Sequence, residues 1–468
     1  MINLIPNLDT TSSKPFYMQI YEHVKKEILS GNLAANSKLP SIRDFSSNTN
    51  LSKNTIDAAY QQLIAEGYIR SKSKSGFFVE NIEQIPENLS SMDYNSSLKQ
   101  SKIKEEFCLY DFTNGQIDLD SFPLSTLRKI INESLLTTEK DLLFYGEHVG
   151  DKGLRFEISK YIYQSRGVLS SPEQIIIGSG TQQSLSLLSL VLQKFDKNLA
   201  FEDPGYIGAR NVFEHYGFDI ASIPVDENGI CINKLKESKS KIVYITPSHQ
   251  FPLGRVMPIK RRVELLNWAL KENSYIIEDD YDGEFRYKGK PIPSLQSLVS
   301  NNRVIYLGTF SKSLMPSIRI SYMVLPKELM EIYKNNFTIY EQPVPRIIQK
   351  SLEIFIKEGH WYKHLKKCRN VYKKKHDLLI SSIYKYFGPK AEVIGADSGL
   401  HILLKVNNGM DETNLISAAK GLGVKVSPTS IYYSFPKKSN PQLIFLGFAG
   451  IKLENIPKGI ELLSTAWL

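Results

Sequence analysis

The chain has 468 residues, of which 42% are hydrophobic and 23% are charged, and its formal net charge is +9. A chain of this length is too long for a single ordinary hydrophobic core, which predicts two or three domains. No run approaches the roughly 18 apolar residues of a membrane span, no signal-peptide pattern opens the chain, and three scattered cysteines fit neither a disulfide framework nor a CxxC metal site. We therefore expect a cytoplasmic protein with no membrane partner.

Residues 16–80 have the order of elements of a winged helix-turn-helix. The segment FYMQIYEHVKKEIL has helical spacing and is stopped by Gly31. A short segment from Ser41 and a turn near 48–51 lead to a second helix, SKNTIDAAYQQLIAEGY, with Ser52 as a plausible N-cap. YIRSKSKSGFFVE then predicts two short strands around a basic turn.

Several side chains of this segment are suited to contact DNA, because short polar and basic groups at the start of a recognition helix can reach base edges and phosphates. They are Arg43 in the preceding helix, Ser52, Lys53, Asn54 and Thr55 at the recognition helix, Lys72 and Lys74 beside the wing turn, and Gly76 within it. The alternative is a small interaction module with a solvated polar helix end.

The rest of the chain divides into a polar linker at 81–106 and a large domain at 107–468. In the large domain, strand-like runs such as QIIIG, NLAFED, KIVYITP, YIIEDDY and RVIYLGTF alternate with helical stretches. This alternation predicts an α/β fold with a mostly parallel sheet and helices on both faces. After about residue 340 the order is mixed, which predicts a smaller C-terminal α+β lobe.

Two turns of the large domain are suited to hold part of a phosphorylated cofactor. Gly178-Ser-Gly-Thr-Gln182 follows a strand and opens an apolar helix, where backbone N–H groups can cradle a phosphate. Asp203-Pro-Gly-Tyr206 places an aromatic ring that could stack on a planar cofactor. Each turn taken alone is common in proteins.

Two further segments carry the reactive groups. Asp279 and Tyr281 fall on one face of a strand, so the carboxylate could keep a pyridine nitrogen protonated while the phenol bonds a ring hydroxyl. Lys312, in Thr309-Phe-Ser-Lys-Ser313, could form a Schiff base if its pKa is lowered. Thr309, Ser311 and Arg319 are close enough in sequence to bind a phosphate beside it. The alternatives are an acidic strand end in solvent and an exposed lysine.

The N-terminal segment resembles the GntR-type winged helix over most of residues 16–80, through LPSIRDFSSNTNLSKNTIDAAYQQLIAEGYI and SGFFV. The resemblance implies DNA contacts by Ser41, Arg43, Ser52, Lys53, Thr55 and Gly76. That family usually has arginine where this chain has Lys53, and a phosphate contact would survive the change, whereas a bidentate base contact would not.

The four cofactor segments, in this order, resemble the fold type I aminotransferases from about 110 to 468. TPSHQFPLG at 246–254 is typical of MocR/GabR-like regulators, which join a GntR winged helix to an aminotransferase-like domain. The resemblance implies pyridoxal 5′-phosphate (PLP), bound as an aldimine to Lys312, with Asp279 at the pyridine nitrogen, Tyr281 at the ring hydroxyl and Tyr206 flanking the ring. It also implies phosphate contacts by Thr181, Gln182, Ser311 and Arg319, with Thr309 as a further candidate, and a pocket lined further by His249 and Gln250.

The sequence therefore predicts a transcription regulator that is a head-to-tail homodimer and binds a double-stranded operator. It would sense PLP or a small amino compound at Lys312 and control vitamin B6 or amino-acid metabolism genes. The first rival is a working aminotransferase with a DNA module, although Phe445 stands roughly where such enzymes hold the substrate carboxylate with arginine. A pure dimerisation scaffold is the third reading, but it would not need Lys312, Asp279 and Arg319.

The effector is predicted not to be GABA. By resemblance, GABA-responsive members use two arginines for the ligand carboxylate, one after the DPGY-like turn and one in the C-terminal lobe. Here Arg210 lies one position later than expected, and Ser427-Pro-Thr-Ser-Ile431 has no arginine. PLP itself is the simplest remaining effector, and an amino acid held by Arg210 or His249 is the alternative.

Overall fold

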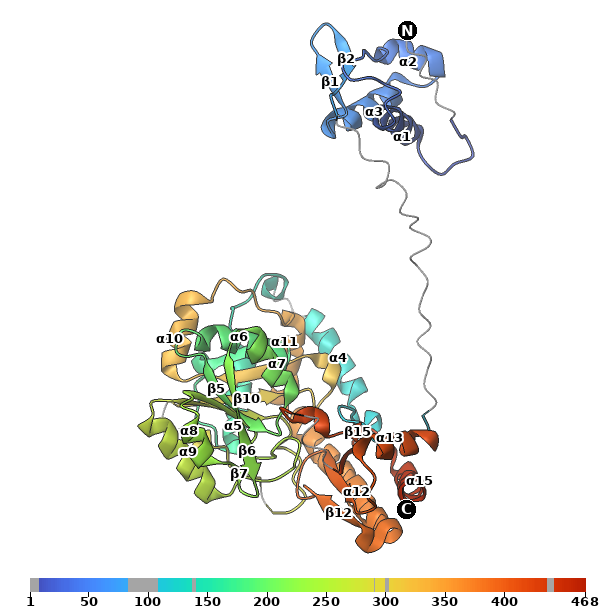
Figure 1. The fold of residues 1–468 in the computed structure, drawn as a ribbon. Coiled ribbons are helices and arrows are strands. Elements are labelled where there is room, and N and C mark those ends of the chain that lie inside the picture. Colours follow the sequence, from blue (N-terminus) through green and yellow to red (C-terminus); the bar gives the residue numbers. More distant parts are fainter. Residues whose placement is uncertain (1–7, 83–107, 137–139, 290, 299–302, 436–441) are drawn as a thin grey trace. The chain divides into compact units, whose positions relative to one another are not determined.

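A computed structural model describes residues 8–82, 108–136, 140–289, 291–298, 303–435 and 442–468. The chain forms two compact units, Met1–Glu105 and Glu106–Leu468, which are described separately (Figure 1). All but the first two residues of the expected linker at 81–106 lie outside the described ranges. No helix in the described ranges is long and apolar enough to cross a membrane.

The N-terminal unit has the predicted helices and strand pair. Its elements are α1 (Phe16–Leu29), α2 (Ile42–Thr49), α3 (Lys53–Ala65), β1 (Ile69–Lys72) and β2 (Gly76–Val79), with β1 and β2 antiparallel. The Ser52 hydroxyl caps α3 by accepting the Thr55 N–H at 3.2 Å, as expected. The apolar faces of the helices meet in one core around Phe45, Ile56 and Tyr60, each fully buried. This core fixes α3 against α2 and so presents the polar start of α3 at the surface.

The second unit is built on an eight-stranded sheet in the order β4-β11-β10-β9-β8-β5-β6-β7. The strands are β4 (Ile175–Gly178), β5 (Asn198–Asp203), β6 (Asp219–Asp226), β7 (Gly229–Ile230), β8 (Ile242–Ile245), β9 (Tyr275–Asp280), β10 (Val304–Thr309) and β11 (Ser321–Val324). The neighbours from β10 through β9, β8 and β5 to β6 are parallel, which confirms the prediction of a mostly parallel sheet. The antiparallel β11, between β10 and β4, was not predicted.

Helices cover both faces of this sheet (Figure 1). They are α4 (Leu124–Leu136), α5 (Lys152–Arg166), α6 (Thr181–Leu192), α7 (Ile207–His215), α8 (Ile232–Glu237), α9 (Ile259–Lys271), α10 (Lys327–Asn336) and α11 (Arg346–Lys357). Ile277 of β9 packs in the core with α6, α7 and α10, whereas its neighbour Ile276 packs with α8 and α9. Strands covered on both sides must be apolar on both sides, which explains their continuous hydrophobic runs.

The C-terminal lobe is a smaller α+β layer, as predicted. It contains α12 (His360–Phe387), β12 (Ala391–Ile394), β13 (His401–Val406), α13 (Glu412–Gly421), β14 (Val424–Lys425), β15 (Ser427–Pro428), β16 (Leu443–Gly447) and α15 (Ile456–Trp467). Its sheet has the order β12-β13-β16-β15. Two details differ from the prediction that this lobe starts near residue 340. Helix α11 packs into the core of the main sheet, and β3 (Tyr110–Asp111) pairs with β14 because Phe112 is buried in the lobe's core.

Candidate functional site

A cavity of about 290 Å³ lies at the carboxyl ends of the parallel strands, the usual place for ligands in open α/β sheets. Its wall includes all nine side chains that the sequence singled out for a cofactor: Thr181, Gln182, Tyr206, Asp279, Tyr281, Thr309, Ser311, Lys312 and Arg319. It also includes residues that sequence reasoning missed: Asn114, Gly115, Thr246, Phe251 and Pro316.

One part of this wall is suited to an anion. Thr181 begins α6 after Gly180, and the first N–H groups of a helix attract negative charge. The Arg319 guanidinium lies beside this turn, where its Nη2 donates to the Ser179 carbonyl at 3.2 Å. The buried Ser311 Oγ has no hydrogen-bond partner among the described residues. A buried hydroxyl without a partner is costly, so a ligand oxygen at this position would satisfy it.

Gly180 is required at this turn. Its φ is +98°, and a Cβ there would lie 2.1 Å from Arg319 Nη2. The missing side chain therefore makes the space that the guanidinium occupies. Thr309 shapes the other side of the anion pocket, because its hydroxyl accepts the Ser311 N–H at 3.1 Å and donates to the Ile320 carbonyl at 3.3 Å.

Lys312 lies just after β10 and lines the cavity. Its Nζ donates to Asn114 Oδ1 at 3.1 Å. Burial lowers the pKa of Lys312, and the negative charge of Asp282 opposes the shift. A larger fraction of the amine is therefore neutral near pH 7, which is the form that attacks a carbonyl carbon.

Asp279 supplies a buried carboxylate to the same cavity. Its Oδ2 accepts the phenol O–H of Tyr244. Burial is the main cause that raises the pKa of Asp279 to about 7, and the charges of Asp280 and Asp282 add to the shift. A positively charged ring nitrogen placed beside it would reverse the shift, because an opposite charge favours the ionised carboxylate.

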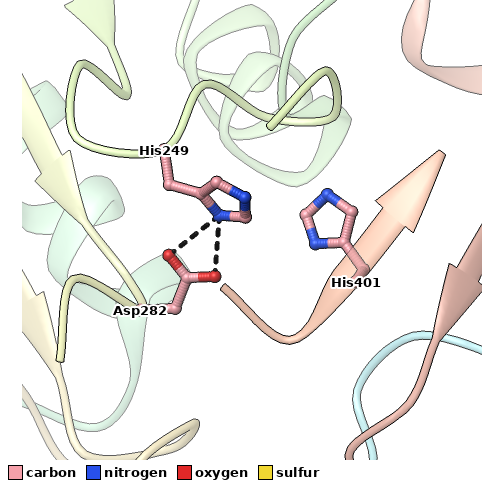
Figure 2. A group of neighbouring side chains, drawn as sticks. All are labelled: His249, Asp282 and His401. Atoms are coloured by element: carbon pink, nitrogen blue, oxygen red, sulfur yellow. Dashed lines mark hydrogen bonds and ion pairs between the residues drawn. The ribbon is translucent and has the colours of Figure 1, made fainter. Parts of the chain in front are cut away.

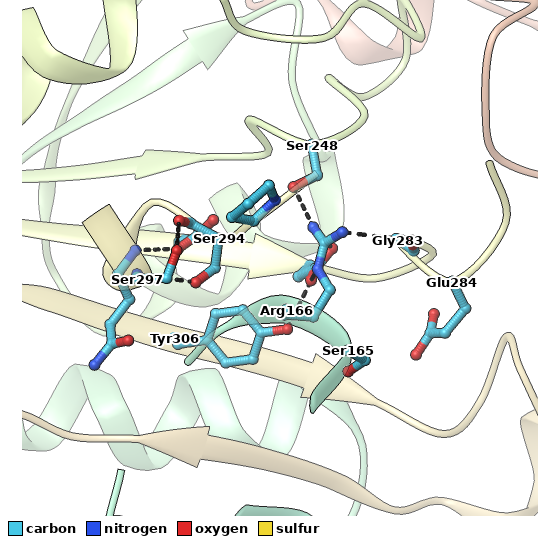
Figure 3. A network of polar contacts seen from close by, with 12 residues as sticks. Ser165, Arg166, Ser248, Gly283, Glu284, Ser294, Ser297 and Tyr306 are labelled. Carbon is cyan, nitrogen blue, oxygen red and sulfur yellow. Dashed lines mark hydrogen bonds and ion pairs between the residues drawn. The ribbon is translucent and has the colours of Figure 1, made fainter. Parts of the chain in front are cut away.

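A buried ion pair between Arg166 and Asp280 stabilises the end of β9, the strand that carries Asp279 (Figure 3). Arg166 donates to both oxygens of Asp280, through Nε at 2.6 Å and Nη2 at 3.0 Å, and also to Ser248 Oγ. Tyr306 donates to Asp280 Oδ2 at 2.6 Å. Because neighbouring strand residues face opposite sides, this network positions Asp279 without entering the cavity.

Two aromatic rings line the cavity between its charged groups. Tyr206 follows β5 at the predicted strand-to-helix turn, and its ring meets that of Phe251 edge-on at a centroid distance of 5.8 Å. Tyr281 lies one residue beyond the end of β9, and its hydroxyl donates to the His249 carbonyl at 3.0 Å. The cavity thus combines an anion pocket, an amine, a carboxylate and flat apolar walls.

His249 and Gln250 were expected to line the cavity, and this expectation is wrong for the described residues. The Gln250 amide donates to the carbonyls of Pro204 and Phe251 at 2.9 and 2.8 Å, so it holds two loops together. His249 Nδ1 lies 2.9 Å from the Tyr281 hydroxyl and bonds Asp282 (Figure 2). The cavity wall includes neither side chain.

Whether the cavity could bind a ligand carboxylate depends on which arginines of the second unit reach it. Arg319 is the only arginine among the described residues of the cavity wall. Arg210, on α7, is outside this wall and donates to Ser222 Oγ at 3.1 Å and to Ser434 Oγ. Phe445, on β16, is fully buried and stacks on His401 at 4.3 Å. The described wall therefore offers no second guanidinium for a carboxylate.

The residues expected to contact DNA lie on the N-terminal unit as follows. Arg43, Lys53 and Lys74 are exposed, and Lys74 has a φ of +60° in the turn between β1 and β2. Gly76 has a φ of +103°, so the turn favours glycine there. Ser41 and Ser52 cap α2 and α3, and Thr55 Oγ1 lies 2.8 Å from Ser52 Oγ. The serines thus stabilise the helix starts whether or not they contact a ligand.

Comparison with known proteins identifies both units. Residues 16–79 match the family model "Bacterial regulatory proteins, gntR family", and residues 109–456 match "Aminotransferase class I and II". The chain is 42% identical to the uncharacterized HTH-type transcriptional regulator YdeL of Bacillus subtilis, with full coverage of both chains. It is 30% identical to the probable rhizopine catabolism regulatory protein MocR of Rhizobium meliloti, covering 98% of this chain and 95% of that protein.

Two further proteins extend the comparison. The pyridoxine biosynthesis transcriptional regulator PdxR of Corynebacterium glutamicum is 28% identical, covering 87% of this chain and 86% of its own. An archaeal alanine:glyoxylate aminotransferase has the same fold as the second unit, with a TM-score of 0.71 and 28% identity, covering 80% of this chain and 93% of its own. The first two relatives match 98% or more of the chain and so extend over both units, whereas the aminotransferase covers 80% of it.

Proposed function

The chain belongs to the MocR-type transcription regulators of the GntR family, and on this premise we propose that it binds operator DNA through its first unit and senses a small molecule through PLP held in the cavity of its second. The class I and II aminotransferase fold belongs to a PLP-binding family, and the GntR unit is a DNA-binding one. The observation that carries the proposal is the meeting of Lys312, Asp279 and the anion pocket in one cavity.

The cavity suits each functional group of PLP. Thr181, Gln182, Ser311 and Arg319 would hold the phosphate, and Ser311 Oγ would gain a partner that no other described residue provides. Tyr206 and Phe251 would flank the ring. The Asp279 carboxylate would accept a hydrogen bond from the protonated pyridine nitrogen. The Tyr281 hydroxyl would have to turn from the His249 carbonyl to donate to the ring oxygen. Lys312 Nζ would be the atom that bonds the aldehyde carbon, with the aldehyde oxygen leaving as water.

Bound PLP supplies an electrophilic carbon and an electron sink to an incoming amine. The Lys312 amine, whose pKa burial lowers, would attach the cofactor, and a competing amine would take its place. Asn114 Oδ1 accepts a hydrogen bond from Nζ at 3.1 Å, so exchange at this atom would change a contact between the segment after β10 and the segment after β3. We infer that this exchange, or attachment itself, is the signal that alters DNA binding.

A sensor role is favoured over efficient transamination. Enzymes that transfer amino groups must also hold the substrate carboxylate, and each charged hydrogen bond to such a group is worth about 1.5–3 kcal/mol. Phe445 is buried at the position where the family resemblance implies an arginine, and the wall has no arginine besides Arg319 among the described residues. The second candidate is slow transamination, which Lys312 and Asp279 could still support.

The finer assignments belong to the same proposal. The protein would act in the cytoplasm as a head-to-tail homodimer on a double-stranded operator. PLP itself is the first candidate effector, supported by similarity to the relative named as a pyridoxine biosynthesis regulator. An amino compound is the second. Arg210 is an unsuitable ligand for it, because its guanidinium bonds Ser222 and Ser434 away from the wall.

Borohydride reduction followed by peptide mapping tests the cofactor proposal. Purified protein should be yellow, and reduction should label Lys312 and no other lysine. Lys312→Ala should lose the visible band, whereas Lys197→Ala, an exposed lysine of the loop before β5, should keep it. Label on a different lysine would contradict the assignment. An unchanged operator affinity with and without PLP would contradict PLP as effector.

A further inference from the structure

His249, Asp282 and His401 form a buried cluster behind the cavity (Figure 2). His249 follows β8 and Asp282 follows β9, whereas His401 begins β13 in the C-terminal lobe. None is more than 3% exposed, and one nitrogen or carboxylate oxygen of each lies within 4.8 Å of the others. The proposed cofactor function gives these three side chains no direct role.

Their hydrogen bonds determine where the imidazole protons are. The two oxygens of Asp282 lie 2.9 and 3.1 Å from His249 Nδ1, and a carboxylate only accepts, so Nδ1 carries the hydrogen. His401 Nε2 lies 2.9 Å from the Pro252 carbonyl and must donate to it. In each neutral ring the other nitrogen keeps an unshared electron pair. These nitrogens are His249 Nε2 and His401 Nδ1.

His249 Nε2 is buried and has no hydrogen-bond partner among the described residues. Buried histidines in a packed core normally satisfy both ring nitrogens, so this atom needs an explanation. Metal-binding histidines donate their other N–H to a carboxylate or a backbone carbonyl, and His249 and His401 do so respectively. The hydrogen bonds that the two rings donate are therefore those expected of two metal ligands. Two purely structural histidines could donate the same bonds, but one of them would then leave a ring nitrogen without a partner.

The spacing of the rings also suits a shared ion. The ring centres of His249 and His401 are 4.9 Å apart, and the ring planes are inclined by 47°. Two imidazoles that bind one zinc ion through bonds of about 2.0–2.1 Å have ring centres roughly 5 Å apart. Figure 2 shows the two rings side by side, with the Asp282 carboxylate bonded to the His249 ring.

We propose that His249 and His401 form a binding site for a divalent transition-metal ion such as zinc, through Nε2 and Nδ1 respectively. Asp282 orients the His249 ring and offsets the positive charge. His249 follows β8 of the eight-stranded sheet, and His401 lies on β13 of the C-terminal lobe. A bound ion would therefore link these two parts of the second unit. It also lies next to the cavity, since the Tyr281 hydroxyl is 2.9 Å from His249 Nδ1.

Equilibrium dialysis against zinc tests the site in the full chain. The protein should carry no histidine tag and have Cys108 replaced by serine, because this exposed thiol would also bind zinc. After chelator treatment, it should take up one zinc ion per chain at micromolar zinc. Cobalt(II) offers a second readout, because nitrogen ligands at low coordination number give visible absorption bands.

Three variants give the result its meaning. His401→Gln keeps a donor for the Pro252 carbonyl but removes the imidazole, so zinc affinity should fall at least tenfold and the cobalt bands should disappear. Asp282→Asn should weaken binding about 10- to 100-fold, the usual effect of losing an outer partner. His215→Gln, which removes an exposed imidazole at the end of α7, should bind like the parent. Circular dichroism checks that each variant is folded.

A parent protein that takes up no zinc overturns the proposal. So does binding that is equal in the parent and in His401→Gln. If His401→Gln does not fold, Asp282→Asn decides in its place, and unchanged zinc affinity in that variant is the contrary result. PLP-free and PLP-bound protein should both bind zinc, which separates a failure of this site from a failure of the cofactor proposal.

Discussion

Replacing Gly180 by alanine should release the cofactor without abolishing the fold. The residue has a φ of +98° and a ψ of 161°, a conformation that almost only glycine adopts. Alanine there costs about 1–3 kcal/mol of unfolding free energy. The new Cβ would also stand 2.1 Å from Arg319 Nη2 and 2.5 Å from Cζ, so the guanidinium must leave its place.

The effect on cofactor affinity follows from that displacement. A hydrogen bond from a charged group is worth about 1.5–3 kcal/mol. Losing one between Arg319 and the phosphate should weaken the apparent affinity for PLP roughly 10- to 150-fold. Gly217→Ala is the matched control, because Gly217 has a φ of +73° but no atom within 4 Å of the added Cβ. It should lose stability through strain alone and keep its affinity for PLP.

Absorbance titration of the PLP-free variants measures the affinity, and urea unfolding measures the stability. Arg319→Ala should reproduce the affinity loss of Gly180→Ala while keeping the glycine backbone. If Gly180→Ala and Gly217→Ala bind PLP within a factor of about three of each other, Arg319 does not hold the phosphate. The anion pocket would then have been assigned wrongly.

Three further predictions concern charge, DNA and the effector. Burial raises the pKa of Asp279 from 3.8 to about 7. The PLP-free chain should therefore lose stability as pH rises from about 4 to 7, because the carboxyl of the unfolded chain ionises first. In urea unfolding, Asp279→Asn should flatten this dependence of stability on pH, and an unchanged slope would refute the prediction. Lys74→Ala should weaken binding to specific and random DNA alike and lower the salt slope by about 0.9, whereas Thr55→Ala should harm the specific site more, as gel-shift titrations over salt concentration would reveal. GABA should produce no change in the visible spectrum below millimolar concentration, because Arg319 is the only arginine in the described cavity wall; a response at micromolar GABA would overturn this exclusion.

Local patterns in the sequence were enough to predict most elements. The Ser52 cap, the helix that ends before Gly31 and the strands ending at Asp203 and Asp280 depend on contacts between residues a few positions apart. The parallel sheet followed from continuous apolar runs, because strands covered on both faces bury both sets of side chains. The antiparallel β11 could not be predicted in this way, since its short apolar run fits either direction.

The cavity could be anticipated only in part. Strand ends and glycine turns indicate where cofactor groups can lie, and all nine such residues do line one wall. Asn114, which bonds Lys312 across 198 positions of the chain, had no local signal. Phe251 lies within the motif at 246–254, but that motif does not show which of its side chains reach the cavity. Which side of a loop faces the cavity also depends on packing, and for that reason His249 and Gln250 turned away from it.

The sequence by itself therefore determined the two units, their element types and the chemistry available to them, because periodicity, caps and turn residues act over a few positions. Tertiary structure alone decided which groups meet. Packing removed Arg210 from the cavity wall, buried Phe445 against His401 and brought His401 to His249 from another lobe. These contacts join residues that are far apart in the chain and depend on how sheets and loops pack. Local sequence patterns do not reveal the packing energies that determine them.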